Sequence, residues 1–195
     1  MYLYGASGHA KVIIDILTDQ GISVDGLIDD DESIEELSGY PVLHGEADLS
    51  PLIISIGQNS IRKRIAERLS VDFGIAVHPS AIISNKVSIG EGTVVMQGAI
   101  IQAYTSIGRH CIINTGVAID HECRIENFVH ISPHATLCGN VSVGEGTWIG
   151  AGATVIQGVK IGKWAVIGAG SVVLTDIPDG VVAVGNKCKV IKNMI

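Results

Sequence analysis

Four of the seven histidines in this 195-residue chain lie between residues 110 and 134. Among them, His121 stands in the run Asp120-His121-Glu122-Cys123, with a carboxylate on either side. A neighbouring carboxylate can orient an imidazole and raise its basicity, as a general base requires. A lone histidine on a surface is usually inert, so the two flanking carboxylates are the reason to single out His121.

A metal site is the other interpretation of these histidines. His130 and His134 follow His121 by nine and thirteen residues, a spacing that suggests zinc shared between subunits. The two residues fall on different phases of the six-residue repeat described below. The four cysteines, at positions 111, 123, 138 and 188, form no CxxC pair. We therefore expect no metal.

Three further polar clusters each follow a short apolar run: Gly5-Ala6-Ser7-Gly8-His9, Asp29-Asp30 and Gly57-Gln58-Asn59. A glycine turn that opens a helix exposes backbone N–H groups suited to an anion, although the same sequence also suits a simple tight turn. The acidic pair could accept hydrogen bonds from a base or from sugar hydroxyls. These clusters favour a nucleotide or nucleotide-sugar over a bare phosphate.

The elements that carry these clusters alternate. We expect strands at residues 2–4, 26–28 and 52–56, a helix with apolar residues at 12, 13, 16 and 17, and a basic helix ending near Arg68. This order predicts a small parallel β-α-β sheet, whose ligands bind at the carboxyl ends of the strands. The segment is Rossmann-like but too short for a complete dinucleotide fold.

A six-residue repeat organises the rest of the chain. From Val77 to Val173, all seventeen residues at intervals of six are Ile, Val or Leu, and glycine gathers at the second and fourth places of the repeat. Neither an amphipathic helix nor an alternating strand has this period. It suits a prism of short parallel strands, three to a coil, with glycine supplying positive φ at the corners. The repeat predicts a mainly β protein, with Cys111 and Cys123 in its core.

Composition limits the function classes. Thirteen Lys and Arg against twenty Asp and Glu give a formal net charge of −7, which argues against nucleic-acid binding. Without a run of 18 apolar residues or a signal-peptide pattern, we expect a cytoplasmic protein with no membrane insertion. Residues 160–195 nevertheless hold five lysines and two aspartates, a local positive charge that suits a phosphate-bearing ligand.

Six motifs in order cover essentially the whole chain: Tyr4-Gly5-Ala6-Ser7-Gly8-His9, Ile28-Asp29-Asp30, Ile56-Gly57-Gln58-Asn59, Asn114-Thr115, His121-Glu122-Cys123 and Val129-His130-Ile131. Together they resemble the sugar O-/N-acyltransferases, the family of the UDP-N-acetylbacillosamine N-acetyltransferases and sialic acid O-acetyltransferases. The resemblance implies a left-handed β-helix and transfer of acetyl from acetyl-CoA to an amine or hydroxyl of a sugar. We expect a UDP-linked 4-amino-sugar; sialic acid O-acetylation and non-catalytic nucleotide-sugar binding are the alternatives.

The resemblance also implies roles for individual residues. His121 would be the general base and Glu122 would tune it. The nucleotide-sugar would be held by Ser7, Gly8, His9, Asp29, Asp30 and Gly57. Acetyl-CoA would contact His130 and the backbone near Ala151 and Ala169, and its thioester would lie near the Gly139 N–H group.

The organisation expected from these patterns has three parts: a nucleotide-sugar-binding domain over 1–76, a β-helix over 77–178, and a C-terminal tail near CoA over 179–195. Related chains commonly end in Gly-x-Pro-Ala-Lys/Arg, whereas this chain has Gly185-Asn186-Lys187-Cys188-Lys189. The family works as homotrimers with a site between two β-helices. We expect the interface among outward apolar residues of the prism, namely Val94, Ile100, Ile112, Ala118, Val166 and Val172.

Overall fold

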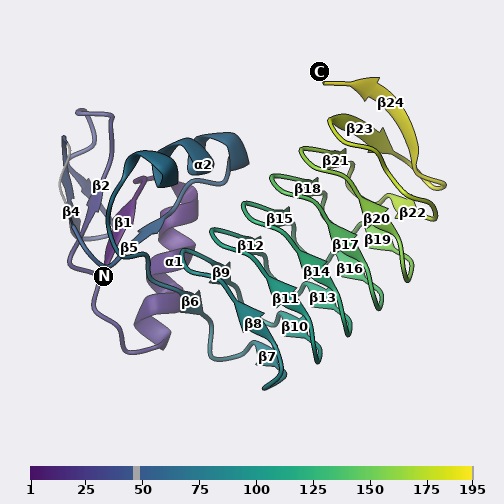
Figure 1. Ribbon diagram of the computed structural model, residues 1–195. Helices are drawn as coiled ribbons and strands as arrows, with labels where there is room; N and C mark the ends of the chain where they lie inside the picture. The colour runs from purple at the N-terminus through teal and green to yellow at the C-terminus, as the bar shows by residue number, and fades with distance from the viewer. Residues whose placement is uncertain (46–48, 195) are drawn as a thin grey trace.

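The computed structural model describes residues 1–45 and 49–194, and it places a small sheet with two helices against one end of a long β-helix (Figure 1). The sheet has the order β3-β4-β2-β1-β5, and its strand β1 pairs in parallel with both β2 and β5. The predicted β-α-β arrangement is confirmed. Its elements are β1 (Tyr2–Tyr4), α1 (Gly8–Asp19), β2 (Gly26–Ile28), β5 (Leu52–Ile54) and α2 (Asn59–Arg68).

A hairpin of β3 and β4, which is not among the predicted elements, extends this sheet. Strands β3 (Glu36–Leu37) and β4 (Tyr40–Leu43) are antiparallel, and β4 adds to β2 in parallel. The turn between them places Ser38 at φ 54° and Gly39 at φ 84°. Two consecutive left-handed residues suit a two-residue hairpin turn, so Ser38-Gly39 is the signal in the sequence.

Residues 76–173 form the left-handed parallel β-helix that the six-residue repeat and the family resemblance predict. Each strand is two residues long: the first side chain points outward and the second inward. The inward residues and the small residues four places later form one continuous apolar core, which includes Cys111 and Cys123 as predicted.

The three faces of the β-helix have different outward side chains. We name the first the bare face, because nothing in the described chain covers it; its outward residues Ile82 and Ile100 are 65% and 37% exposed. Its strands are β7 (Ile82–Ile83), β10 (Ile100–Ile101), β13 (Ala118–Ile119), β16 (Thr136–Leu137), β19 (Thr154–Val155) and β22 (Val172–Val173).

The second face carries Ser, Arg and Lys as its outward residues, and we name it the polar face. Such side chains remain stable in water, so this face needs no cover. Its strands are β8 (Ser88–Ile89), β11 (Ser106–Ile107), β14 (Arg124–Ile125), β17 (Ser142–Val143) and β20 (Lys160–Ile161).

The third face, the covered face, lies against the N-terminal unit at its first coils (Figure 1). Its strands are β6 (Ala76–Val77), β9 (Val94–Val95), β12 (Ile112–Ile113), β15 (His130–Ile131), β18 (Trp148–Ile149), β21 (Val166–Ile167), β23 (Val181–Val184) and β24 (Lys189–Asn193). Strand β24 runs antiparallel to β23. The residues expected to form a tail thus include a hairpin that continues the sheet.

The covered face corrects part of the expected interface. Val94 and Ile112 are each 1% exposed, because they pack with residues of α1 such as Ile13 in the apolar core of the N-terminal unit. They are therefore not available to a second chain. Ile100 of the bare face is exposed, as expected.

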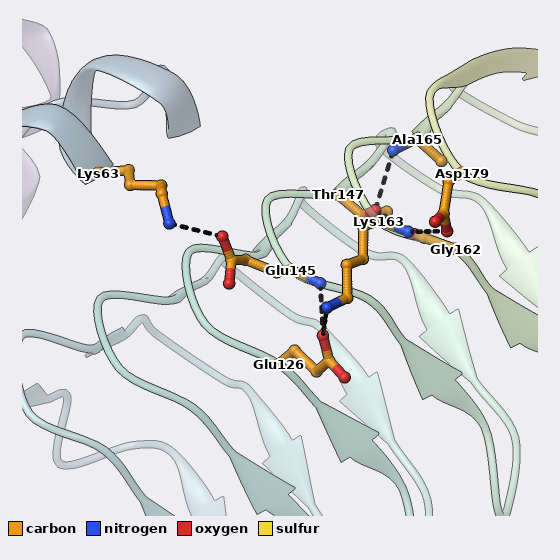
Figure 2. Close-up of polar contacts among 8 residues, drawn as sticks. All are labelled: Lys63, Glu126, Glu145, Thr147, Gly162, Lys163, Ala165 and Asp179. Carbon is orange, nitrogen blue, oxygen red and sulfur yellow. Dashed lines mark hydrogen bonds and ion pairs between the residues drawn. The ribbon is translucent and has the colours of Figure 1, made fainter.

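Polar contacts also join the two parts and neighbouring coils (Figure 2). Lys63 of α2 donates to Glu145 of the β-helix at 2.7 Å. Within the β-helix, the buried hydroxyl of Thr147 accepts the N–H of Ala165 and donates to the carbonyl of Gly162, so it bridges two coils. Among residues 1–45 and 49–194, no helix is long and apolar enough to cross a membrane.

Candidate active site

His121 and Glu122 lie in the turn between β13 and β14, at the corner between the bare face and the polar face. His121 Nδ1 is 3.0 Å from Glu122 Oε2, and Asp120 Oδ1 accepts the His121 backbone N–H at 2.8 Å. Glu122 sits at φ 59°, in the corner position where other coils have glycine. When Nδ1–H donates to Glu122, Nε2 has a free lone pair, which is the arrangement of a general base.

Gly139 occupies the next coil directly beside His121. A Cβ atom at residue 139 would lie 2.6 Å from both Cε1 and Nε2 of the imidazole, so only glycine leaves room for the ring in this place. The sequence predicts Gly139 near the reacting thioester, and the structure places it against the free nitrogen of the predicted base. Sequence reasoning alone does not reveal this contact, because the two residues are eighteen positions apart.

The surroundings of His121 are open. The His121 side chain is 55% exposed, and a hollow of about 300 Å³ lies beside it on the bare face. The hollow is lined by outward and corner residues that include Gln102, Asp120 and Cys138. Nothing within the described chain closes over the imidazole.

His130 lies on the covered face and belongs to a different set of contacts. Its ring stacks in parallel on Trp148, with 5.4 Å between centroids and 7° between planes. The amide of Asn114 donates to His130 Nε2 at 3.1 Å, while its oxygen accepts the Thr115 N–H. Since Nε2 accepts, neutral His130 carries its proton on Nδ1, which has no partner among the described residues.

A groove of about 430 Å³ runs beside this stack along the covered face. Its walls combine apolar side chains with exposed backbone, a combination common in small-molecule sites. His130, Ala151 and Ala169, three of the four residues expected to contact acetyl-CoA, line it together; the other lining residues are Asn114, Ser132, Pro133, Trp148, Gly150, Val166, Ile167 and Gly168. The fourth expected residue, Gly139, lies with His121 instead.

At the carboxyl ends of β1, β2 and β5, part of the predicted nucleotide cluster already makes internal contacts. Asp29 Oδ2 accepts the Ala6 N–H at 2.6 Å, which fixes the turn before α1, and Asp30 accepts the hydroxyl of Tyr4. Ser7 and Gly8 are exposed at the start of α1. Asp29 thus shapes the turn, while the exposed backbone and side chains beside it remain free for a ligand.

The N-terminal cluster and the groove meet around His9, Gly57 and Trp148. Burial and, to a smaller extent, the positive charge of Arg62 together lower the pKa of His130 to about 3 and that of His9 to about 4. Both imidazoles are therefore neutral at pH 7. His9 Nε2, like His130 Nδ1, is buried and has no hydrogen-bond partner among the described residues.

A second hollow, of about 620 Å³, connects the loop after β5 to the groove. It is lined by Gly57, Gln58, Asn59, Ser60, Gly146, Trp148, Trp164, Val166 and Met194. Sequence reasoning misses both tryptophans. Trp148 occupies the outward place of its hexapeptide, which is a usable signal, whereas Met194 reaches the hollow only because β24 turns back along the covered face.

The chain does not bring the predicted base to the predicted donor site. His121 lies at the corner between the bare and polar faces, whereas His130 lies on the covered face. Among residues 1–45 and 49–194, no three His, Cys, Asp or Glu side chains are grouped as metal ligands. Burial raises the pKa of the Cys123 thiol, which makes it a poor nucleophile.

Comparisons with known proteins identify both parts of the fold. The family model of the PglD N-terminal domain matches residues 1–69, and the model of the bacterial transferase hexapeptide (six repeats) matches residues 140–175. A short match, 33% identical over 72 residues, spans only 15% of an uncharacterised protein of Acanthamoeba polyphaga mimivirus.

Several solved structures match almost the whole chain. A mutant of perosamine N-acetyltransferase from Caulobacter crescentus, in complex with CoA and GDP-perosamine, is 38% identical with a TM-score of 0.93, over 98% of this chain and 96% of that one. The acetyltransferase domain of PglB from Neisseria gonorrhoeae, in complex with acetyl coenzyme A, is 35% identical with a TM-score of 0.90, over 97% and 98%. WeeI from Acinetobacter baumannii is 29% identical with a TM-score of 0.90, over 97% and 98%.

The fold and these similarities define a hexapeptide-repeat acyltransferase. The chain belongs to the family of sugar acetyltransferases with an N-terminal PglD-type domain and a left-handed β-helix.

Proposed function

We propose that this protein transfers the acetyl group of acetyl-CoA to the amino group of a nucleotide-linked amino-sugar. The observation that carries the proposal is the His121–Glu122 pair, set beside Gly139 on a fold shared over nearly its full length with perosamine N-acetyltransferase. The similar structures favour an amine over a hydroxyl as acceptor. We place the enzyme in the cytoplasm, as the sequence predicts.

The chemistry is a direct attack on the thioester. The acceptor nitrogen forms a bond with the thioester carbonyl carbon while neutral His121 takes its proton at Nε2. The C–S bond then breaks, and the CoA thiolate leaves with the proton that the His121 imidazolium returns. Glu122 holds Nδ1–H and stabilises the imidazolium that forms. A covalent intermediate on Cys123 is unfavourable, because this thiol is buried and its pKa is raised.

The acceptor and the donor would occupy neighbouring parts of the molecule. Ser7, Gly8, His9, Asp29, Asp30 and Gly57 would hold the nucleotide-sugar, and Asp29 also fixes the turn before α1. The groove beside His130, Ala151 and Ala169 suits the pantetheine arm, because it is long, apolar and close to backbone groups. Gly139 N–H would then point toward the thioester oxygen supplied at His121.

A homotrimer would complete the site. His121 and the groove belong to different corners of one chain, so no single chain offers both to one acetyl group. Packing three columns around a threefold axis places the His121 corner of one chain against the groove of the next. The bare face, with Ile82 and Ile100 exposed, supplies the apolar surface that such packing needs.

The test is a turnover assay with acetyl-CoA and a panel of UDP-, GDP- and dTDP-linked 4-amino-sugars, matched 4-hydroxy sugars and CMP-sialic acid. Release of CoA with an amino-sugar alone supports the proposal, and the preferred base names the nucleotide. Acetylation of sialic acid alone would replace N-acetylation with the O-acetyl alternative. Thermal stabilisation by a nucleotide-sugar without any turnover would identify a binding protein instead.

A further inference from the structure

Arg62 is a fully buried arginine between the N-terminal unit and the β-helix. It lies on α2, its exposure is 1%, and its guanidinium donates to oxygens of both parts of the molecule. In the β-helix it reaches the carbonyls of His110 at 2.8 Å and Phe128 at 3.1 Å. In the N-terminal unit it reaches Ile56 O at 2.9 Å, Gly57 O at 3.2 Å and Asn59 Oδ1 at 2.7 Å.

The charge of Arg62 has no carboxylate partner. Within the part of the chain that the structure describes, all its acceptors are neutral oxygens, and no ion pair reaches it. Burial lowers its pKa to about 10, so the group stays protonated at neutral pH. Burying an unpaired cation is costly, and an apolar side chain of similar volume often serves packing better. The contacts of Arg62 therefore point to a role beyond filling space.

All the hydrogen bonds of Arg62 except the one to His110 end beside the two ligand regions. Ile56 and Gly57 follow the carboxyl end of β5, where the acceptor is expected, and Phe128 precedes His130 of the donor groove by two residues. The guanidinium thus spans from one region to the other in a single rigid plane.

Asn59 makes a second link of the same kind. Arg62 orients its side-chain oxygen, and its Nδ2 donates to the carbonyls of Gly146 at 3.0 Å and Thr147 at 3.3 Å. Trp148, the stacking partner of His130, follows directly in the chain. Both links therefore end within two residues of the groove wall.

We propose that Arg62 is a positioning residue that fixes the loop 57–59 relative to the strand of His130, and so sets the distance from the bound nucleotide-sugar to the acyl donor. The inference rests on the proposed function for the identity of the two ligands. This role requires the planar guanidinium with its several N–H donors, which the ammonium of lysine cannot replace. Misplacement by about 1 Å is enough to slow a two-substrate reaction about 100-fold.

The test compares Arg62→Lys with Lys63→Met. Lys63 also joins α2 to the β-helix through Glu145, and its ammonium lies 5.3 Å from the centroid of the Phe128 ring, but it donates no hydrogen bond to the backbone of either ligand region. We expect Arg62→Lys to lower kcat about 10- to 100-fold while the separate Kd values for acetyl-CoA and the nucleotide-sugar change by less than about threefold. Lys63→Met is expected to keep kcat within about twofold, even if it melts at a lower temperature.

An unchanged kcat in folded Arg62→Lys, or an equal loss in Lys63→Met, would overturn the inference. If Arg62→Lys does not fold, Arg62→Met takes its place in the same comparison, since an apolar side chain tolerates this burial.

A wild-type protein that acetylates no nucleotide-sugar would contradict the proposed function. Amide hydrogen exchange would then test separately whether Arg62 positions the loop and the strand. Segments 56–60 and 128–131 should exchange about tenfold faster in Arg62→Lys than in Lys63→Met. Equal exchange would reject the positioning role.

Discussion

At the scale of single residues, the reaction depends on His121 and its carboxylate. His121→Ala should lower kcat about 10²- to 10⁴-fold, the usual contribution of a positioned base, without loss of acetyl-CoA binding. Glu122→Gln should lower kcat less than His121→Ala does. Its amide oxygen can still accept Nδ1–H but cannot stabilise the imidazolium as a carboxylate does. Steady-state kinetics with a melting curve for each variant measure this, and a folded His121→Ala protein with near wild-type turnover would contradict the assignment.

Individual site residues differ in whether the sequence alone can predict them. Flanking carboxylates are neighbours in sequence, so His121 can be found without a structure. Arg62 cannot be found in this way, because its acceptors at residues 56, 57, 110 and 128 come together only through folding. The sequence predicts Asp29 as a ligand residue, and this stays a prediction; side-chain type does not reveal that Asp29 also accepts the N–H groups of Ala6 after β1 and of Asp31 after β2.

At the scale of the elements, the hexapeptide predicts the strands because its inward aliphatic residue and its corner residue both recur every six positions. One aliphatic residue per side fixes the core, and a left-handed residue at the fourth place turns the corners from Gly92 to Gly170, as Gly98 does at φ 67°. The hairpin of β23 and β24 lies outside this period. A tail expected only to lie near CoA thus becomes a wall of the hollow through Met194.

Glycines at the second and fourth places of the repeat have different surroundings, as Gly90 and Gly98 show. A Cβ at Gly90, a second-place glycine, would lie 2.7 Å from backbone atoms of the next coil, whereas one at Gly98 would meet nothing within 4 Å. Gly90→Ala should therefore destabilise the protein by about 1–3 kcal/mol, because two backbones must move apart. Chemical denaturation measures the change.

Gly98→Asn is the matched control. Asparagine tolerates positive φ, and Asn140 already occupies the equivalent place in another coil at φ 58°, so stability should stay close to that of the wild type. A Gly90→Ala protein as stable as Gly98→Asn would show that the coils are not held apart at the distance seen in the structure.

At the scale of the whole molecule, the three faces of the β-helix have different partners. The polar face is exposed to solvent, and the N-terminal unit packs on the first coils of the covered face. The bare face keeps exposed isoleucines next to the His121 corner. A trimer interface on this face would bury these side chains and also enclose His121, so catalysis would depend on assembly.

The decisive prediction concerns mixed trimers. One chain carries His121→Ala and has an intact groove; the other carries Ala169→Arg, which fills the groove, and has an intact His121. Neither homotrimer should be active. If each cleft takes its base from one chain and its donor groove from the next, random mixing restores about one quarter of the clefts, because two independent choices among two chains must both be correct. Light scattering confirms the assembly and CoA release measures the recovery. An active monomer would contradict the shared cleft, as would mixed trimers that remain silent.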